Sequence, residues 1–175
     1  MNFVPFVVQR KSPIMKSKFE YYLDKFPEIE LPITLTEDMY VEFNKHNDVL
    51  QNEFIDEFIN AYEPNDPEDY TEVVPCLKLK KKGDIHYVLY WRADLLNYSF
   101  ILASYNKAGK MVDKKSIAGL EVRGNKIFRT AAVINEDYSV VCVEGAENED
   151  KTFDAEASVS RRYETNTEGL IEQLY

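Results

Sequence analysis

The second half of the chain alternates apolar and polar residues, and this alternation is the strongest constraint on the fold. From Val73 onward it recurs in short runs, separated by turns such as Lys82-Gly83-Asp84. Connections this short favour hairpins, since parallel neighbours need crossovers of a dozen or more residues. The expected strands are 73–80, 85–92, 97–105, 126–134, 138–144, 152–164 and 170–175. The sequence therefore predicts a mainly antiparallel β-meander of about six to seven strands.

Two of these stretches carry further information. The stretch 84–109 is apolar on both faces, which is typical of the centre of a sheet, and we expect most of its aromatic side chains in the core. The run 152–164 has one polar face, and Arg161 is the residue that breaks its alternation. Between them, residues 111–120 fit a strand, a bulge or a loop.

The first part of the chain has the spacing of helices. Apolar residues predict amphipathic helices at 16–26 and 48–62, and a further helix is one interpretation of 36–46. Residues 1–14 fit poorly with the helical spacing that begins at Lys16 and are expected to be an N-terminal extension. We therefore predict an α+β fold with one domain over 15–175. Its helical part, 15–72, packs on one face of the antiparallel sheet formed by 73–175.

Charge is unevenly distributed along the chain. The formal net charge is −10, yet residues 73–134 contain 12 basic and 4 acidic residues, a net of +8. The flanking segments are acidic: 16–72 has 4 basic and 16 acidic residues, and 135–175 has 3 and 11. Two interpretations are open. The basic strands and acidic helices balance one another within the fold, or an acidic face stays exposed and docks a basic protein.

The second interpretation supplies a candidate protein-binding surface. It lies where acids are densest, with Tyr and Phe anchors at its centre that supply affinity while the charges act on rate and selectivity. The residues expected to contact a basic partner are Glu53, Asp56, Glu57, Glu63, Asp66, Glu68, Asp69, Glu147, Glu149 and Asp150.

No pattern in the sequence indicates catalysis, so we expect a non-enzymatic protein with no catalytic residue, metal or cofactor. His46 and His86 lack the spacing of a metal site and are expected at a helix end and on a sheet face. Cys76 and Cys142 are expected as buried thiols in a reducing compartment, the cytoplasm. The acidic charge disfavours nucleic acid and anionic membranes as partners, and no run reaches the roughly 20 apolar residues of a membrane helix.

Two segments carry a resemblance: FPEIELPITL at 26–35 and YETNTEGLIEQLY at 163–175. With the hairpins between them, the chain resembles small acidic bacterial proteins of the immunity-protein type, which bind and neutralise a toxin made by the same cell. The resemblance covers most of 15–175, assigns no residue roles, and implies occlusion of a cognate toxin by an acidic surface. The alternatives are a small-ligand-binding protein with a pocket at the sheet, a scaffold that associates through a strand edge, and an enzyme that uses only acidic, Tyr and Lys residues.

Overall fold

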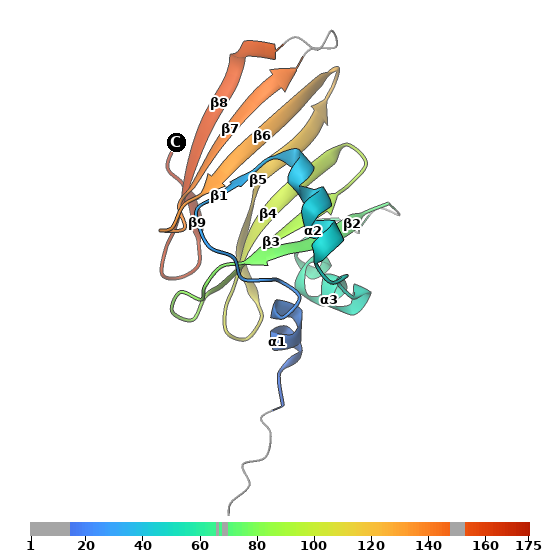
Figure 1. Ribbon diagram of the computed structural model, residues 1–175, viewed down its shortest axis with the longest axis vertical. Helices are drawn as coiled ribbons and strands as arrows, with labels where there is room; N and C mark the ends of the chain where they lie inside the picture. Colours follow the sequence, from blue (N-terminus) through green and yellow to red (C-terminus); the bar gives the residue numbers. More distant parts are fainter. Residues whose placement is uncertain (1–14, 66, 68–69, 148–152) are drawn as a thin grey trace, which may run out of the picture.

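One antiparallel sheet of nine strands forms the body of the protein, as the computed structural model shows (Figure 1). The structure describes residues 15–175 except 66, 68–69 and 148–152. In that part of the chain the strands follow the order β2-β3-β4-β5-β6-β7-β8-β9, with β1 beside β6. They span β1 Ile33–Leu35, β2 Glu72–Lys78, β3 His86–Ala93, β4 Asn97–Tyr105, β5 Met111–Arg123, β6 Lys126–Ile134, β7 Val140–Glu147, β8 Phe153–Thr165 and β9 Ile171–Gln173. The predicted antiparallel meander is confirmed, but the sheet is larger than expected.

Two strands account for the larger sheet. β1 lies inside the Pro-containing segment before the second helix and pairs with residues 132–134 of β6. β5 covers the stretch whose structure the sequence left open. It pairs with β4 along its length, but with β6 only over residues 119–123. Among the described strands, the part of β5 before Gly119 pairs only with β4, and the edge of β6 that β5 no longer occupies is paired with β1. The sheet therefore divides at Gly119.

The sheet is curled, because its last hairpin returns to the strands of its first half. The hydroxyl of Ser104 on β4 donates to the carbonyl of Gly169 at 2.6 Å, and the backbone N–H of Ile171 donates to Asp113 on β5 at 2.9 Å. These bonds close β9 over β4 and β5. The curl encloses the larger of two apolar cores, to which every strand from β1 to β9 contributes a side chain.

β3 is covered on both faces, as its two-sided apolar pattern predicted. Leu89 and Trp91 belong to the larger core, whereas Val88 and Tyr90, which point to the opposite face, belong to a smaller one. Most aromatic side chains of 84–109 are buried, which confirms that expectation. β3 is paired on both edges but lies next to the edge strand β2 rather than at the middle of the sheet.

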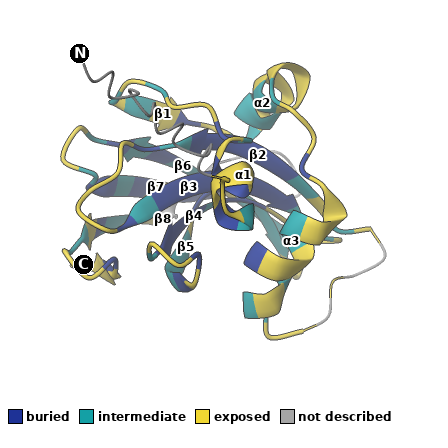
Figure 2. Ribbon diagram, turned by 90° about the horizontal axis from the view of Figure 1, so that it is seen from below, coloured by how far each residue is buried: buried dark blue, intermediate teal, exposed yellow. Residues whose placement is uncertain are grey.

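Short helices pack on both faces of the sheet, so the expectation that they cover one face was wrong. In Figure 2 the first helix lies in front of the sheet, with the third helix below it to the right and the second above. Phe19 and Phe58, from the first and third helices, close the smaller core over Tyr105. Tyr40 of the second helix stacks on Trp91 in the larger core. The helices are α1 Lys18–Leu23, α2 Tyr40–His46 and α3 Asn52–Phe58, with 3-10 turns η1 Glu37–Met39 and η2 Asn60–Tyr62.

The helix expected over 48–62 is shorter than its apolar spacing suggested. Only Asn52–Phe58 is α-helical, and Gln51 before it has an extended backbone with ψ of 143°. Leu50 enters the core from that extended segment, where it is almost fully buried. A helix of this length has little stability of its own, so tertiary packing decides where it begins and ends.

Candidate functional site: an aromatic groove and a charged cavity

The predicted acidic residues on α3 lie next to a basic residue of α1. Lys18 contacts Glu53 at 2.5 Å and also forms an ion pair with Glu57. Asp56, one turn from the end of the helix, accepts a hydrogen bond from the side-chain amide of Asn60 at 2.9 Å. The three acids of α3 that were predicted to contact a partner therefore already interact with other side chains of the chain, although all three are exposed.

The other described acids of the prediction are also paired. Glu63 is largely buried and lies 2.5 Å from Lys114 and 3.8 Å from Arg92. Glu147 at the end of β7 accepts from Arg129 of β6 at 3.1 Å. These pairs follow the first interpretation of the charge pattern, balance within the fold. Five of the predicted residues lie outside the described part of the chain: Asp66, Glu68, Asp69, Glu149 and Asp150.

An open groove lined by three aromatic rings lies between α2 and the sheet. The rings of Tyr40 and Trp91 are stacked, with centroids 4.9 Å apart and planes 9° apart. The ring of Tyr98 on β4 also stacks on Trp91, with centroids 6.4 Å apart and planes 29° apart. Trp91 is only 3% exposed and forms the floor, whereas Tyr98 is 37% exposed and forms a wall. We call this hollow of about 410 Å³ the aromatic groove; its lining is Glu37, Asp38, Tyr40, Val41, Glu72, Trp91, Ala93, Tyr98 and Leu120.

The charged side chains that line the aromatic groove are all acidic. Glu72 lies on β2, next to Ala93 in the sheet register. Glu37 and Asp38 come from η1; Glu37 forms an ion pair with Arg129, and Asp38 accepts a hydrogen bond from the Thr36 hydroxyl at 2.6 Å. The groove therefore offers an apolar floor and an anionic rim to the same ligand.

Exposed apolar side chains gather at this groove. Val41 on α2 is 50% exposed and lines the groove together with Tyr98. Leu95 and Leu96, both exposed, form the turn that joins β3 to β4, between the groove residues Ala93 and Tyr98. Apolar residues clustered on a surface and rimmed by polar ones mark interaction sites more often than residues scattered singly.

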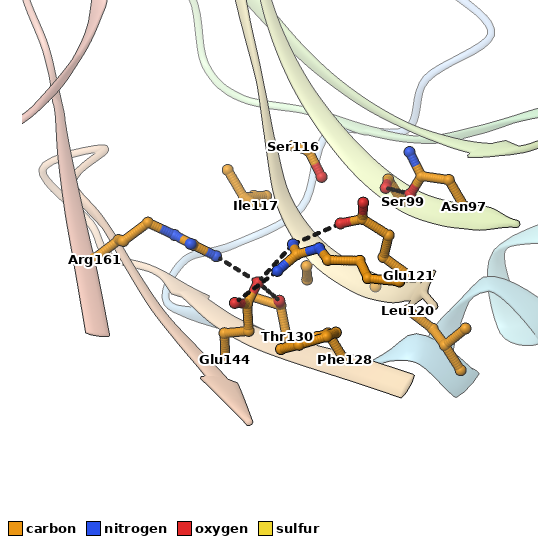
Figure 3. Close-up of a pocket in the computed structure, with 13 residues that line it drawn as sticks. Asn97, Ser99, Ser116, Ile117, Leu120, Glu121, Phe128, Thr130, Glu144 and Arg161 are labelled. Carbon is orange, nitrogen blue, oxygen red and sulfur yellow. Dashed lines mark hydrogen bonds and ion pairs between the residues drawn. The ribbon is translucent and has the colours of Figure 1, made fainter. Parts of the chain in front are cut away.

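A second hollow, the charged cavity, lies where β5, β6, β7 and β8 come together (Figure 3). Its volume is about 180 Å³. Glu144 of β7 is at its centre and is only 5% exposed. Alternation along β7 puts Glu144 on the side of the strand that carries the core residues Val140 and Cys142. The cavity therefore continues the larger core outward, with a charged lining in place of an apolar one.

Two arginines and a hydroxyl hold Glu144. Arg123 donates from both terminal nitrogens, at 3.3 and 3.2 Å, and Arg161 donates at 3.0 Å. Thr130 donates its hydroxyl at 3.4 Å, while Arg123 also reaches Glu121 at 2.6 Å. Burial raises the pKa of Glu144, but the hydrogen bonds from both arginines outweigh it and hold the pKa below its ordinary value. The carboxylate is therefore charged at neutral pH.

Neither histidine and neither cysteine lines either hollow. His46 is exposed and contacts the carbonyl of Glu42 in its own helix at 2.8 Å. His86 packs edge-on against Phe19, and burial lowers its pKa. Both cysteines are buried and not in a disulfide, and burial raises the pKa of the Cys142 thiol to about 11. In the described residues, no three His, Cys, Asp or Glu side chains are placed to hold a metal ion, and no helix is long and apolar enough to cross a membrane.

The sequence analysis did not single out either hollow as a site. Trp91 was expected in the core and is buried there. The groove was missed because Tyr40, which stacks on Trp91, comes from a distant part of the sequence. For the charged cavity one signal was present. Arg161 occupies an apolar-face position of β8, and that break in alternation marks the place where the cavity begins.

Comparison with known proteins yields no assignment: no family model matches the chain, and neither the curated proteins nor the solved structures contain a significant match.

Proposed function

We propose that this protein is a non-enzymatic binding module that docks a basic segment of another protein in the aromatic groove. The observation that carries the proposal is the composition of the groove. An apolar floor at Trp91 lies beside three carboxylates, and among the described residues no basic side chain belongs to the lining.

A basic protein segment has the chemistry that matches this composition. Lys and Arg present long apolar stems with a cationic end, so one side chain can fill an apolar groove and meet a carboxylate at its rim. A cation over the face of Trp or Tyr gains a further attraction of about 0.5–2 kcal/mol. Aromatic anchors at the centre of an interface supply most of its affinity, and the surrounding charges speed the encounter and exclude acidic competitors.

The overall charge supports the same partner chemistry. A formal net charge of −10 attracts a basic protein over distance, including through acids that are individually paired. The immunity-type role implied by the sequence resemblance is one form of this proposal. In that form the basic segment surrounds the active site of a cognate toxin, and docking occludes it.

The groove can be tested by selecting peptides from a random displayed library on the immobilised protein. We expect enriched peptides to carry Lys or Arg beside an apolar anchor, and to change the fluorescence of Trp91, the single tryptophan of the chain. The variant Val41→Lys places a positive charge in the groove and should abolish their binding. Val143→Lys is the matched control, because Val143 on β7 is also 50% exposed but lies outside the groove.

Two results would contradict the proposal. One is selection of acidic or uncharged peptides, and the other is equal binding of the selected peptides to the two lysine variants. The toxin form has its own test, in which the product of a gene next to this one in the source genome is titrated against the protein. Binding that Val41→Lys removes and Val143→Lys retains supports it; no binding at micromolar concentration excludes that partner.

A further inference from the structure

We propose that the charged cavity is a second binding site, for a small uncharged polyhydroxyl compound of the size of a monosaccharide. This inference concerns Glu144, Arg123 and Arg161 and their neighbours, and it does not depend on the function proposed for the aromatic groove.

The cavity is lined by groups that can donate and accept hydrogen bonds in turn. In Figure 3 Ser99 and Ser116 lie on one side and Glu144 with Thr130 on the other, and Arg123 donates to both Glu121 and Glu144. Within the described structure Arg161 uses only Nη2, for Glu144, and a guanidinium carries five N–H donors. Donors and acceptors that alternate around one small space suit a ligand with neighbouring hydroxyl groups, because each hydroxyl both donates and accepts hydrogen bonds.

The charge balance of the cavity selects against an ionic ligand. Arg123 and Arg161 are offset by Glu121 and Glu144, so the lining has a formal net charge of zero. An ion that left water for this site would lose its hydration without a net opposite charge to compensate. A neutral hydroxyl loses less hydration, yet it still gains the stronger hydrogen bonds that charged partners make.

The presence of a partly buried ion cluster, Glu144 with Arg123 and Arg161, at the end of an apolar core also needs an explanation. Replacing a buried ion cluster by apolar residues of similar volume is often neutral or stabilising, so stability alone does not require these charges. The side of β7 and β8 that carries them is apolar further along, at the register pair Val140 and Tyr163. A binding role accounts for a charged lining at the open end of an otherwise apolar core.

The size and shape of the cavity limit the ligand. Its volume of about 180 Å³ is below the roughly 300–1,000 Å³ of pockets for drug-sized molecules. Gly119 contributes backbone alone to the wall, and a Cβ atom there would lie 1.9 Å from the carbonyl oxygen of Tyr98. The backbones of β4 and β5 therefore approach closely at this point of the wall, and the small volume favours a compact ring over a long chain.

The inference can be tested by amide NMR shifts of the whole protein. The probes are D-glucose, D-galactose, D-mannose and N-acetyl-D-glucosamine at millimolar concentration, with sodium acetate and ethylammonium chloride as ionic probes. We expect at least one sugar to give saturable shifts centred on Asn97, Ser99, Ser116 and Thr130, and neither ion to do so. Ser116→Ala removes an exposed hydroxyl of the lining and should weaken sugar binding by roughly threefold to tenfold. Ser158→Ala, an exposed serine of β8 outside the lining, should leave it unchanged.

A variant of the charged lining separates recognition from folding. Arg161→Lys keeps the charge but loses the planar fork of donors, so we expect binding to fall about tenfold or more while the amide spectrum stays that of a folded protein. Three results would overturn the proposal: no sugar produces saturable shifts, an ionic probe binds more tightly than every sugar, or Ser116→Ala and Arg161→Lys bind as the unchanged protein does.

Discussion

The aromatic groove and the charged cavity both contain carboxylates, but they use them in opposite ways. In the cavity Glu144 is buried and accepts hydrogen bonds from Arg123, Arg161 and Thr130. In the groove the acids stand on the rim, around the stacked rings of Tyr40 and Trp91, and the described part of the chain adds no basic side chain to the lining. The two hollows lie on adjoining parts of one sheet, since β5 lines both of them.

The difference is between a carboxylate that is paired with arginines inside the fold and carboxylates that are available to a binding partner. A buried carboxylate without partners costs several kcal/mol, so the fold surrounds Glu144 with donors. A carboxylate on a wet rim costs little to leave without a basic partner. Glu37 is already ion-paired with Arg129, so Asp38 and Glu72 are the carboxylates of the groove that a basic partner would meet. We therefore expect loss of the buried charge of the cavity to lower stability, in addition to any effect on the proposed sugar binding, and substitutions in the groove to act on binding with little effect on stability.

The largest effect should come from the backbone that separates the two hollows. Gly119 has a φ of +139° and no room for a Cβ atom beside Tyr98, a wall of the groove. Gly119→Ala should therefore lower the free energy of unfolding by about 3 kcal/mol or more, as measured by urea denaturation. Gly124→Ala is the control: its φ of +63° is also unfavourable for alanine, but the space around it is open. It should cost about 1 kcal/mol, and equal losses for the two variants would contradict the assignment of strain to Gly119.

The next effect should be the loss of the buried charge at the centre of the cavity. Glu144→Gln leaves Arg161 without its anionic partner and Arg123 with Glu121 alone, and we expect a loss of about 2 kcal/mol. This is less than for fully buried pairs because the Arg161 and Arg123 side chains are 28% and 45% exposed. Glu147→Gln breaks a pair of the same type on the same strand, where the carboxylate side chain is 26% exposed rather than 7%. It should cost less than about 1 kcal/mol, and a cost equal to that of Glu144→Gln would show that the cavity gives no special role to its carboxylate.

The sequence was sufficient for the sheet, because period-two alternation and short turns are local signals. It was insufficient for the split at Gly119 and for β1, since both arise from pairing between residues about one hundred positions apart. The extent of α3 was missed for a similar reason. Its spacing is helical from Asp48 onward, but the burial of Leu50 in an extended segment is decided by the core.

The candidate sites were predictable only in part, and the reason is again distance along the chain. The charge pattern drew attention to Glu53, Glu57 and Glu63, whose partners Lys18 and Lys114 come from other elements. Tyr40 and Trp91 are in contact but lie far apart in the sequence, and no shared pattern links them. Arg161 did give a local signal, because it breaks the apolar–polar alternation of 152–164. A charged residue at an inward position of a strand indicates either that the strand's register was predicted wrongly or that the charge has a buried partner. Here the partner is Glu144.

A smaller effect, dependent on pH, should distinguish the cavity from ordinary surface acids. The pKa of Glu144 is lower in the folded protein than its ordinary value of 4.5, so the unfolded state binds a proton first as the pH falls. The stability contributed by Glu144 is then fully present above pH 4.5 and is lost as the pH falls through the lower folded pKa. In urea denaturation from neutral to acid pH, the gap between the unchanged protein and Glu144→Gln should close below pH 4.5. A gap that stays constant would mean that the carboxylate charge is not what stabilises the cavity.

The smallest effect on stability should come from the groove, although its effect on binding is the largest proposed. Val41 and Tyr98 are 50% and 37% exposed, so Val41→Lys and Tyr98→Ser should each change the free energy of unfolding by less than about 1 kcal/mol. Both should nevertheless weaken the peptides selected on the groove by tenfold or more, as followed by Trp91 fluorescence. If either variant instead destabilises the fold as much as Glu144→Gln while peptide binding is unchanged, the rings and carboxylates of the groove serve packing. The contrast between a cavity whose carboxylate is paired within the fold and a groove whose rings and acids bind a partner would then fail, because the groove too would be structural.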